Sequence, residues 1–367
     1  MPTRVVFGEC LGQVTSIAGE LGTERALIIT GKNAMRKHGV TARLTDLLKP
    51  VESEVFDQAE PNPAIATFDK AQNVLKQSGC NLVVGLGGGS SLDVAKVVAA
   101  LGNRDQSPSQ VFVSPTKIKS KGLPMIAIPT TSGSGSEVTP FSLLNDPENG
   151  TKKAAGHPFL YPTVALVDPS LCTTMPRDVT AETGLDAISH AIESYWAKKA
   201  SPVTDSITLD ALGHLLPNLR KACEEPSNMD ARSEMALGAM EAGMALGNTM
   251  ATAAHSISYP LTVRFNIPHG LACALTLPLF VKFNAPSIQG KIPRLLQAMG
   301  VGSVDEAAES LTQLMGDVGV PTRLSELGIG KDDIPWIVEH GFAPARMANN
   351  PREVSAEDVE EILKKIL

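Results

Sequence analysis

The feature that most constrains the fold is an alternation of short apolar runs with helical patterns in the first half of the chain. Four runs are rich in β-branched and aliphatic residues, at 26–30, 81–86, 124–128 and 163–167. Continuous apolar runs of this length are typical of parallel strands that are buried on both faces. Between them, residues 63–78 place Phe68, Ala71 and Leu75 on one helical face. The pattern predicts a doubly wound α/β domain.

The second half of the chain has a different pattern. After Asp168-Pro169 the strand signals stop, and from Thr180 onward helical patterns follow one another with prolines between them. A chain of 367 residues fits two domains of about 150 residues or more. We therefore predict an α/β domain over 1–180 and an all-helical domain over 181–367.

Charge, hydropathy and cysteine content exclude several classes of protein. The chain has 32 Lys plus Arg against 39 Asp plus Glu, and its net charge of −7 argues against a nucleic-acid binder. The N-terminus lacks an apolar signal region, and no run of about 18 uncharged apolar residues occurs. A cytoplasmic protein without a membrane partner is expected. The five scattered cysteines contain no CxxC pair, which favours buried, reduced thiols.

A glycine-rich turn follows the second apolar run. Gly87, Gly88, Gly89 and Ser90 separate this run from a helical pattern. Glycines let backbone N–H groups approach a diphosphate, and the helix N-terminus adds a favourable dipole. The turn matches neither GxGxxG nor the GK[ST] of a P-loop. A phosphate-binding turn and a ligand-free tight turn both remain open.

A second loop rich in small and hydroxyl residues follows the run at 124–128. Its sequence, at 129–139, is PTTSGSGSEVT. Ligands of parallel α/β sheets usually bind at the carboxyl ends of the strands, where this loop is expected to lie. The alternative is a mobile Ser/Gly loop.

Histidines and one aspartate form the third candidate site. Asp186 and His190 are spaced i, i+4, which places both on one face of a helix where they can hold one cation. His255 and His269 follow later in the helical half. Imidazole and carboxylate ligands suit iron, zinc, manganese or nickel. The other histidines, which show no such partner in the sequence, are assigned structural roles: His38, His157, His214 and His340.

Taken together, these motifs resemble the iron-containing, metal-dependent group III alcohol dehydrogenases. The resemblance covers nearly the whole chain and is carried by 87–90, 129–139, 184–193, 255–269 and 349–352. It implies a Rossmann-like N-terminal domain, an α-helical metal-binding C-terminal domain, and a nicotinamide cofactor. It also implies a divalent metal, most often Fe²⁺ and sometimes Zn²⁺, held by Asp186, His190, His255 and His269.

The resemblance also implies a set of cofactor contacts. Gly87, Gly88, Gly89 and Ser90 would contact the diphosphate, and Asp93 on the following helix is included in the set. Thr130, Thr131 and Ser134 would line the nicotinamide side. Lys152 or Lys153 would reach the ribose.

The choice between NAD and NADP depends on the residues after the first apolar run. NAD-preferring relatives often carry an Asp there that bonds the ribose hydroxyls, whereas this chain has Gly31-Lys32-Asn33. Replacing an anion by a cation relieves repulsion of a 2′-phosphate. We therefore hypothesise a preference for NADP(H). The alternative is that Lys32 is a solvated loop lysine.

Two residues bear on the chemistry and the substrate. Many family members carry a second His four residues after the first histidine of the 255–269 segment, and here that position is Tyr259. Tyrosine can donate a proton or shape the pocket, and we favour shaping because its usual pKa is about 10. Arg264 is a candidate anchor for an anionic substrate, with a structural salt bridge as the alternative.

The expected function is hydride transfer between a nicotinamide and a small aliphatic alcohol or aldehyde. An aromatic content of only 4% argues against a stacking wall for a ring substrate. A phosphonate- or sulfonate-bearing aldehyde is a candidate, since residues 258–262 are similar to such branches. The alternatives are a polyol dehydrogenase, a maleylacetate reductase or a catalytically silent binding module. The sugar-phosphate cyclase branch is disfavoured, because it needs more cations than Arg264. By family habit, a homodimer or larger assembly is expected.

Overall fold

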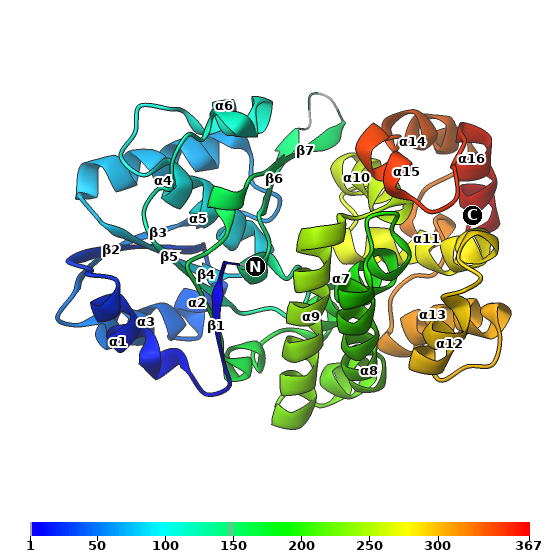
Figure 1. Cartoon of the computed structure of the whole chain (residues 1–367), viewed down its shortest axis with the longest axis horizontal. Coiled ribbons are helices and arrows are strands. Elements are labelled where there is room, and N and C mark those ends of the chain that lie inside the picture. Colours follow the sequence, from blue (N-terminus) through cyan, green and yellow to red (C-terminus); the bar gives the residue numbers. More distant parts are fainter. Residues whose placement is uncertain (1, 147, 149) are drawn as a thin grey trace. The chain divides into compact units, whose positions relative to one another are not determined.

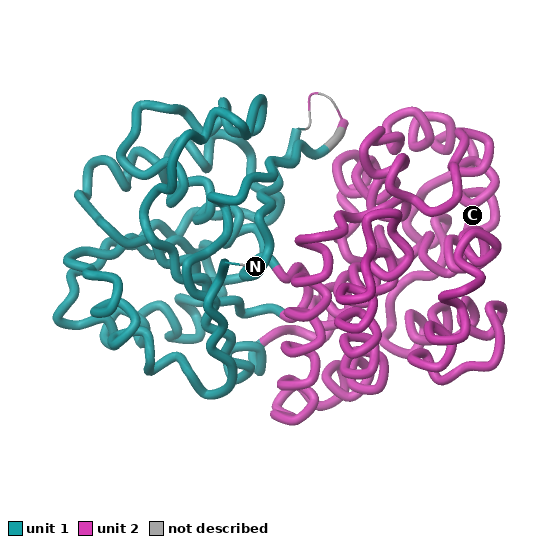
Figure 2. The backbone as a smooth tube through the Cα atoms, viewed as in Figure 1, with its two compact units in different colours: residues 1–131, 136–146, 152–174 teal, residues 132–135, 147–151, 175–367 magenta. Residues whose placement is uncertain are grey.

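The computed structural model describes residues 2–146, 148 and 150–367, which divide into two compact units (Figure 2). Unit 1 contains the described residues up to 131 together with 136–146 and 152–174. Unit 2 consists mainly of residues 132–135 and 175–367. This division differs in three details from the limits predicted by sequence, 1–180 and 181–367. The helical unit begins at 175, and both the short loop 132–135 and the described residues 148, 150 and 151 belong with it.

Unit 1 is built on a six-stranded parallel sheet with the order β1-β8-β5-β4-β2-β3 (Figure 1). The strands are β1 (Arg4–Phe7), β2 (Arg25–Gly31), β3 (Glu52–Ala59), β4 (Leu82–Gly87), β5 (Met125–Pro129) and β8 (Val164–Val167). The four apolar runs are the four inner strands, as predicted. The sequence missed β1 and β3, because these edge strands are only partly buried and carry charged or polar residues.

Helices cover both faces of this sheet because successive residues of each strand point to opposite sides. In β2, Leu27 and Ile29 pack in the core of one face, and Ala26 and Ile28 in the core of the other. The first core includes residues of α4 (Ile65–Ser78), α5 (Gly89–Leu101) and α6 (Pro108–Val113). The second includes residues of α1 (Val14–Glu20) and α3 (Val40–Leu48). The domain is therefore doubly wound.

The strand order places a change of direction beside the glycine turn. From β2 the chain moves outward to β3, whereas from β4 it moves the other way, to β5 and β8. Neighbouring strands whose connections diverge in this way leave a crevice at their carboxyl ends, where α/β sheets bind ligands. β2 ends at Gly31 and β4 ends at Gly87. A separate two-stranded sheet is formed by β6 (Phe141–Asp146) and β7 (Thr151–Gly156).

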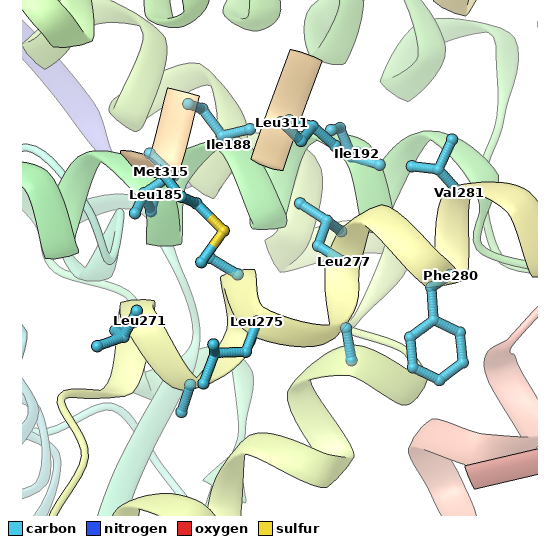
Figure 3. Close-up of a cluster of buried hydrophobic side chains, with 14 of the residues drawn as sticks. Leu185, Ile188, Ile192, Leu271, Leu275, Leu277, Phe280, Val281, Leu311 and Met315 are labelled. Carbon is cyan, nitrogen blue, oxygen red and sulfur yellow. The ribbon is translucent and has the colours of Figure 1, made fainter. Parts of the chain in front are cut away.

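Unit 2 is helical. Its helices are α7 (Arg177–Trp196), α8 (Pro202–Glu224), α9 (Met229–Thr249), α10 (Ala253–Phe265), α11 (His269–Asn284), α12 (Ile292–Met299), α13 (Val304–Val318), α14 (Ile334–His340), α15 (Pro344–Asn349) and α16 (Ala356–Lys365). Its core includes Ile188 and Ile192 of α7, Leu275 of α11 and Met315 of α13 (Figure 3). This packing holds α7 and α11, which carry three of the candidate metal ligands, in one rigid core.

All five cysteines are free and buried, which confirms the expectation of reduced thiols. Among the described residues, none of the helices combines the length and apolar character required to cross a bilayer.

Candidate functional site

Three helices of unit 2 bring the four predicted metal ligands together. On α7, Asp186 Oδ1 lies 3.7 Å from His190 Nε2, as expected for an i, i+4 pair. His255 of α10 places its Nε2 3.6 Å from the same oxygen. The His255 ring lies 4.6 Å from that of His190 and 5.5 Å from that of His269, measured between centroids. The carboxylate and three imidazoles thus form one cluster.

His269 reaches this cluster because α11 begins in close contact with α7. A Cβ atom on Gly270 would lie 1.9 Å from the Glu182 carbonyl oxygen and 2.8 Å from Asp186 Cβ. No side chain fits in that space, so position 270 requires glycine. The N-terminus of α11 therefore lies directly against the turn of α7 that carries Asp186.

Glu193, which the sequence analysis did not assign, orients His255. Its carboxylate contacts His255 Nδ1 and accepts hydrogen bonds from Thr252 Oγ1 at 2.5 Å and from the backbone N–H of Ala254 at 3.1 Å. A carboxylate on one imidazole nitrogen fixes the tautomer and leaves the other nitrogen to ligate. The sequence did contain a signal, because Glu193 is two helical turns after Asp186 and shares its face.

The protonation of Asp186, Glu193 and His190 matches the needs of a cation. Burial alone would raise the pKa of Asp186, yet His190, His255 and His269 hold it well below its usual range. The pKa of Glu193 is likewise lowered, since His255 and Thr252 outweigh its burial. Burial lowers the pKa of His190. Ionised carboxylates and a neutral imidazole are the forms that bind metals. Burial alone would lower the pKa of His255, but Cys273, Glu193 and Asp186 raise it well above its usual value, so a metal would have to displace its proton.

Several ligand atoms of the cluster are buried without a hydrogen-bond partner among the described residues. They are Asp186 Oδ1, His190 Nδ1 and His255 Nε2. Buried polar atoms are rarely left unpaired, because each costs about 1–3 kcal/mol of desolvation. The donor set, its burial and these unpaired atoms fit a divalent transition metal.

Cys273 adds a thiol that the sequence analysis did not assign. It lies one turn after His269 on α11, with Sγ 4.0 Å from both ring nitrogens of that histidine. Asp186, His255, His269 and Cys273 offer potential ligand atoms that all lie within 4.8 Å of one another. Burial raises the pKa of the Cys273 thiol. The i, i+4 spacing from His269 was the available signal.

Tyr259 lies beside the cluster and is contacted by Arg346 of α15. The Tyr259 and His269 ring centroids are 5.9 Å apart. Arg346 Nη2 donates to the Tyr259 hydroxyl oxygen, and the guanidinium stacks 4.4 Å from the ring centroid. Burial raises the pKa of Tyr259, so the phenol keeps its proton. No sequence signal links Arg346 to this site.

Arg264, the predicted substrate anchor, has a different environment. Its Nη2 lies 3.7 Å from Asp333 Oδ1, and its guanidinium stacks 4.4 Å from the Trp336 ring centroid. Neither neighbour belongs to the histidine cluster. These contacts fit the alternative interpretation, a structural ion pair.

In unit 1, the glycine turn and the Thr130-Thr131 segment lie against each other. The Thr130 N–H donates to the Gly87 carbonyl at 3.0 Å, and a Cβ on Gly88 would lie 3.3 Å from the Thr131 side chain. Gly87 has a φ of 143°, which favours glycine. Helix α5 begins at Gly89. Exposed N–H groups at a helix start suit a phosphate. Ser134, also predicted to line the cofactor, belongs to unit 2.

The two candidate ribose lysines differ in their partners. Lys152 is buried and its Nζ donates to Asn62 Oδ1 at 2.9 Å, while the Asn62 N–H donates to Ser90 Oγ at 3.2 Å. Lys152 is therefore linked to the glycine turn. Lys153 is half exposed and pairs with Asp146 at 2.7 Å.

Asp93 is directed into the interior of unit 1. It accepts hydrogen bonds from Ser136 Oγ at 2.6 Å and from the Leu143 N–H at 2.8 Å, and it lies 3.7 Å from Lys96 Nζ. These contacts occupy its carboxylate and link α5 to residues 136–143.

Lys32 is exposed after β2, as expected for a residue that could meet a cofactor. Glu60 lies near it. Burial alone would raise the pKa of Glu60, but hydrogen bonds from Thr67 and Ala64 and the charge of Lys32 hold it below its usual value.

The expectation that His214 has no ligand-type partner was wrong. On α8, its Nε2 lies 4.0 Å from Asp210 Oδ1, one turn earlier. Its Nδ1 lies 2.6 Å from Glu234 Oε2, and Nε2 lies 3.9 Å from Glu241 Oε2, both on α9. The i, i+4 spacing of Asp210 and His214 was a signal that the sequence analysis overlooked.

Comparisons with known proteins show which family the chain belongs to. The model of the family "Iron-containing alcohol dehydrogenase" matches residues 2–169, and that of the "Fe-containing alcohol dehydrogenase family, C-terminal" matches 180–367. The chain is 33% identical to lactaldehyde reductase of Escherichia coli K12, over 99% of both chains. It is also 33% identical to sulfoacetaldehyde reductase of Bilophila wadsworthia, over 98% of this chain and 96% of that protein.

A solved structure extends the likeness to three dimensions. Sulfoacetaldehyde reductase from Bifidobacterium kashiwanohense, in complex with NAD⁺, superimposes with a TM-score of 0.93 at 32% identity. The match covers 100% of this chain and 97% of that one. Family models that span both units, relatives of equal length and a shared fold agree: the chain belongs to the iron-containing alcohol dehydrogenase family, whose members are oxidoreductases acting on alcohols.

Proposed function

We propose that the chain is a metal-dependent NAD(P)(H) alcohol dehydrogenase and aldehyde reductase whose substrates are small aliphatic aldehydes, anionic ones included. The observation that carries the proposal is the histidine cluster of unit 2. Asp186 and His255 are buried and present ligand atoms that have no hydrogen-bond partner among the described residues. A structural cluster would satisfy these atoms, whereas a metal-binding cluster leaves them for the cation.

Asp186, His190, His255 and His269 would hold the metal, with Fe²⁺ as the first candidate and Zn²⁺ as the second. When bound, the metal supplies Lewis-acid polarisation of the substrate oxygen, and the nicotinamide supplies or accepts the hydride. Glu193 keeps His255 in the tautomer whose Nε2 faces Asp186.

Tyr259 and Arg346 would shape the substrate side of the cluster. Arg346 donates to the phenol oxygen, which helps to fix the position of the Tyr259 hydroxyl. The raised pKa of Tyr259, which burial causes, argues for orienting a polar group instead of releasing a proton near neutral pH. Tyr259→Phe should leave the pH profile of kcat unchanged, and a lost basic limb would support the proton-donor role instead.

We place the dinucleotide at the carboxyl ends of β2 and β4. Gly87, Gly88, Gly89 and Ser90 would contact the diphosphate, and Lys152, linked to Ser90 through Asn62, would reach the ribose. Thr130, Thr131 and Ser134 are kept as nicotinamide-side contacts. Asp93 is removed from the set because its carboxylate is held by Ser136 and Leu143. Lys153 is removed because it pairs with Asp146.

NADP(H) is kept as the preferred cofactor because Lys32 is exposed beyond Gly31 at the end of β2. The NAD⁺ bound in the Bifidobacterium enzyme favours the opposite choice. Measuring kcat/KM for NADPH and NADH decides, and a tenfold preference for NADH would overturn the Lys32 hypothesis. Lys32→Ala then tests the residue itself.

For the substrate, we transfer the role of anion anchor from Arg264 to Arg346. Arg346 contacts Tyr259 beside the histidine cluster, whereas Arg264 pairs with Asp333. A guanidinium can hold a sulfonate, phosphonate or carboxylate through two hydrogen bonds. The sulfoacetaldehyde reductases among the relatives support an anionic aldehyde, and the lactaldehyde and propanediol enzymes support a small neutral one.

Two matched variants test the anchor. Arg346→Gln should lower kcat/KM for sulfoacetaldehyde and phosphonoacetaldehyde by about 10- to 100-fold, the loss of one charge-assisted pair. It should change the values for propanal and butanal much less. Arg264→Gln is the control and should leave kcat/KM unchanged for both the anionic and the neutral aldehydes. Equal losses for charged and neutral aldehydes would contradict the anchor.

The proposed function itself is tested anaerobically. The chelator-stripped protein is supplied with Fe²⁺ or Zn²⁺, and the oxidation of NADPH or NADH is followed with neutral and anionic aldehydes. Metal-restored turnover is the expected result. Cofactor binding without turnover of any aldehyde or alcohol, in metal-loaded protein, would favour a catalytically silent binding module.

Two further predictions are kept as part of the proposal. A homodimer or larger homo-oligomer is expected, and light scattering of the purified protein tests it. A cytoplasmic location is also proposed, and fractionation of the native cells tests it.

A further inference from the structure

A second cluster of histidine and carboxylates lies between α8 and α9, which pack against each other in unit 2 (Figure 1). Asp210, His214 and Glu241 each offer a potential ligand atom, and these atoms all lie within 4.8 Å of one another. Donors on a tetrahedral metal lie about 3.4 Å apart when each bond is about 2.1 Å long. To bind one metal, the ligand atoms would have to move closer together by roughly 1 Å. Asp210 can make this movement because 71% of its side chain is exposed.

A glycine on α9 allows α8 and α9 to approach each other closely at this cluster. Gly238 of α9 faces α8, and a Cβ there would lie 3.1 Å from His214 Cβ and 3.0 Å from the Ala211 carbonyl oxygen. The missing side chain lets the two helices meet at the turn that carries His214. Glu234 and Glu241 are one turn before and one turn after Gly238, so both carboxylates reach the imidazole.

The imidazole is held in a ligating orientation. Glu234 Oε2 lies 2.6 Å from His214 Nδ1, which fixes the proton on that nitrogen and directs Nε2 toward Asp210 and Glu241. A carboxylate bound to one imidazole nitrogen while the other faces ligand atoms is the arrangement typical of metal-binding histidines. His255 and Glu193 show the same arrangement in the predicted metal centre.

The cluster has an excess of negative charge. Three carboxylates surround one imidazole, and even a protonated His214 leaves 1 − 3 = −2 when all are ionised. Glu241 Oε2 is buried with no hydrogen-bond partner among the described residues. Burial and Asp210 raise the pKa of Glu241 to about 7. The pKa of His214 is also raised, because Glu234 and Glu241 outweigh its burial.

We propose that this cluster is a second divalent transition-metal site, with His214 Nε2, Asp210 and Glu241 as protein ligands and Glu234 orienting the imidazole. Mixed imidazole and carboxylate donors suit Zn²⁺, Fe²⁺ or Co²⁺. Half-open to solvent, the site leaves coordination positions for water and binds more weakly than the buried cluster. The cation clamps α8 to α9. The proposal does not depend on the proposed enzymatic activity.

Metal stoichiometry tests the site in the full chain. After removal of metals, equilibrium dialysis against Zn²⁺ should show two equivalents in the native protein, one in Asp186→Asn and one in His214→Gln. His38→Gln, a change at an exposed histidine outside both clusters, is the matched control and should keep two. Glu234→Gln should keep two equivalents but weaken the second by about 10- to 100-fold, as expected for an orienting carboxylate.

Two readouts that do not depend on activity complete the test. In the Asp186→Asn background, Co²⁺ should give visible absorption that disappears in the Asp186→Asn, His214→Gln double variant. Zn²⁺ should raise the Tm of the first protein and not of the second. Failure of Asp186→Asn to bind any Zn²⁺, or identical binding by the double variant, would overturn the proposal. The cluster would then be a group of ionisable side chains that share protons and bind no metal.

Discussion

Each unit of the protein buries a charged cluster, and the two clusters are satisfied in different ways. In unit 1, Lys96 Nζ donates to Ser136 Oγ, Thr139 Oγ1 and the Phe141 carbonyl, at 2.6, 3.1 and 2.8 Å, and it faces Asp93. Its donors are used within the protein. In unit 2, Asp186, His190 and His255 leave buried ligand atoms unpaired among the described residues.

This difference distinguishes a buried cluster that stabilises the fold from one that binds a ligand. A buried charge is tolerated when a counter-charge and hydrogen bonds compensate it, as Lys96 does for Asp93. A buried cluster with unpaired ligand atoms needs a group from outside the chain. We therefore expect that breaking the unit 1 cluster costs stability, and that breaking the unit 2 cluster costs metal binding and activity. The predictions follow in order of decreasing effect.

The largest effect is expected from removing a metal ligand. Asp186→Asn should lower kcat/KM by a factor on the order of 10³, the loss typical of a missing electrostatic group in an active site. Its unfolding free energy in chelator should fall less than that of Lys96→Met, because the amide keeps the shape of the carboxylate and can still form hydrogen bonds. Activity assays and urea unfolding in chelator measure the two quantities. A stability loss as large as that of Lys96→Met would erase the distinction.

The opposite balance is expected in unit 1. Lys96→Met leaves Asp93 and Glu137 buried without their cation, which should lower the unfolding free energy by about 3 kcal/mol. Zn²⁺ binding by the folded fraction should persist, since the ligands are all in unit 2. Urea unfolding and metal analysis of the same sample check both expectations. Lys70→Met, which replaces an exposed helical lysine by the same residue, is the matched control.

The pH dependence of stability provides a subtler test. Burial raises the pKa of Glu137 to about 7 in the folded protein, against an ordinary value of 4.5. Between these two pH values the folded state keeps a proton on Glu137 that the unfolded state has lost. The contribution of this group to stability is therefore fully present below pH 4.5 and is lost as the pH rises through 7. Glu137→Gln mimics the protonated acid, so its stability should fall less over that window.

The expected gain of Glu137→Gln over the native protein is roughly 2–3 kcal/mol at pH 7.5 and close to zero at pH 4.5. Urea unfolding at both values measures it. Lys96, whose pKa burial lowers to about 8, begins to titrate near the upper of these two values in both proteins. An advantage for the variant that is independent of pH would contradict the assignment of the proton to Glu137.

The smallest effect is expected from the orienting carboxylate. Glu193→Gln keeps the shape of the side chain but weakens its hold on His255 Nδ1, so metal affinity should fall by about 10- to 100-fold. At saturating metal, most of the activity should return. Titration with Fe²⁺ or Zn²⁺, followed by turnover, measures the shift. An unchanged metal affinity would reduce Glu193 to a structural role.

Much of this organisation was predictable from the sequence. The four inner strands were found because they are buried on both faces and carry continuous apolar runs, whereas the edge strands β1 and β3 do not. The proximity of Asp186 and His190 was predictable from helical spacing. His255 and His269 were candidates as imidazoles of the same helical half, and the family resemblance assigned them to the same site. Glu193 and His214 had helical-spacing signals that were not used.

Other parts of the site depend on tertiary packing that a sequence does not display. Arg346 belongs to the short helix α15, and only the fold brings it to Tyr259. Asp93 lies in the motif after the glycine turn, yet Ser136 and Leu143, more than 40 residues later, occupy its carboxylate. Gly270 and Gly238 are required because a Cβ atom there would clash with a neighbouring helix, and the sequence alone does not show that contact.

One titration tests the central claim most directly. Chelator-stripped native protein and Asp186→Asn are titrated with Fe²⁺ under anaerobic conditions, while bound metal and oxidation of NADPH or NADH by a small aldehyde are measured in the same samples. We predict that turnover of the native protein rises in proportion to the metal bound at its tightest site, and that the variant lacks both this site and the turnover. Full turnover without metal, or equal metal-restored turnover in Asp186→Asn, would contradict it.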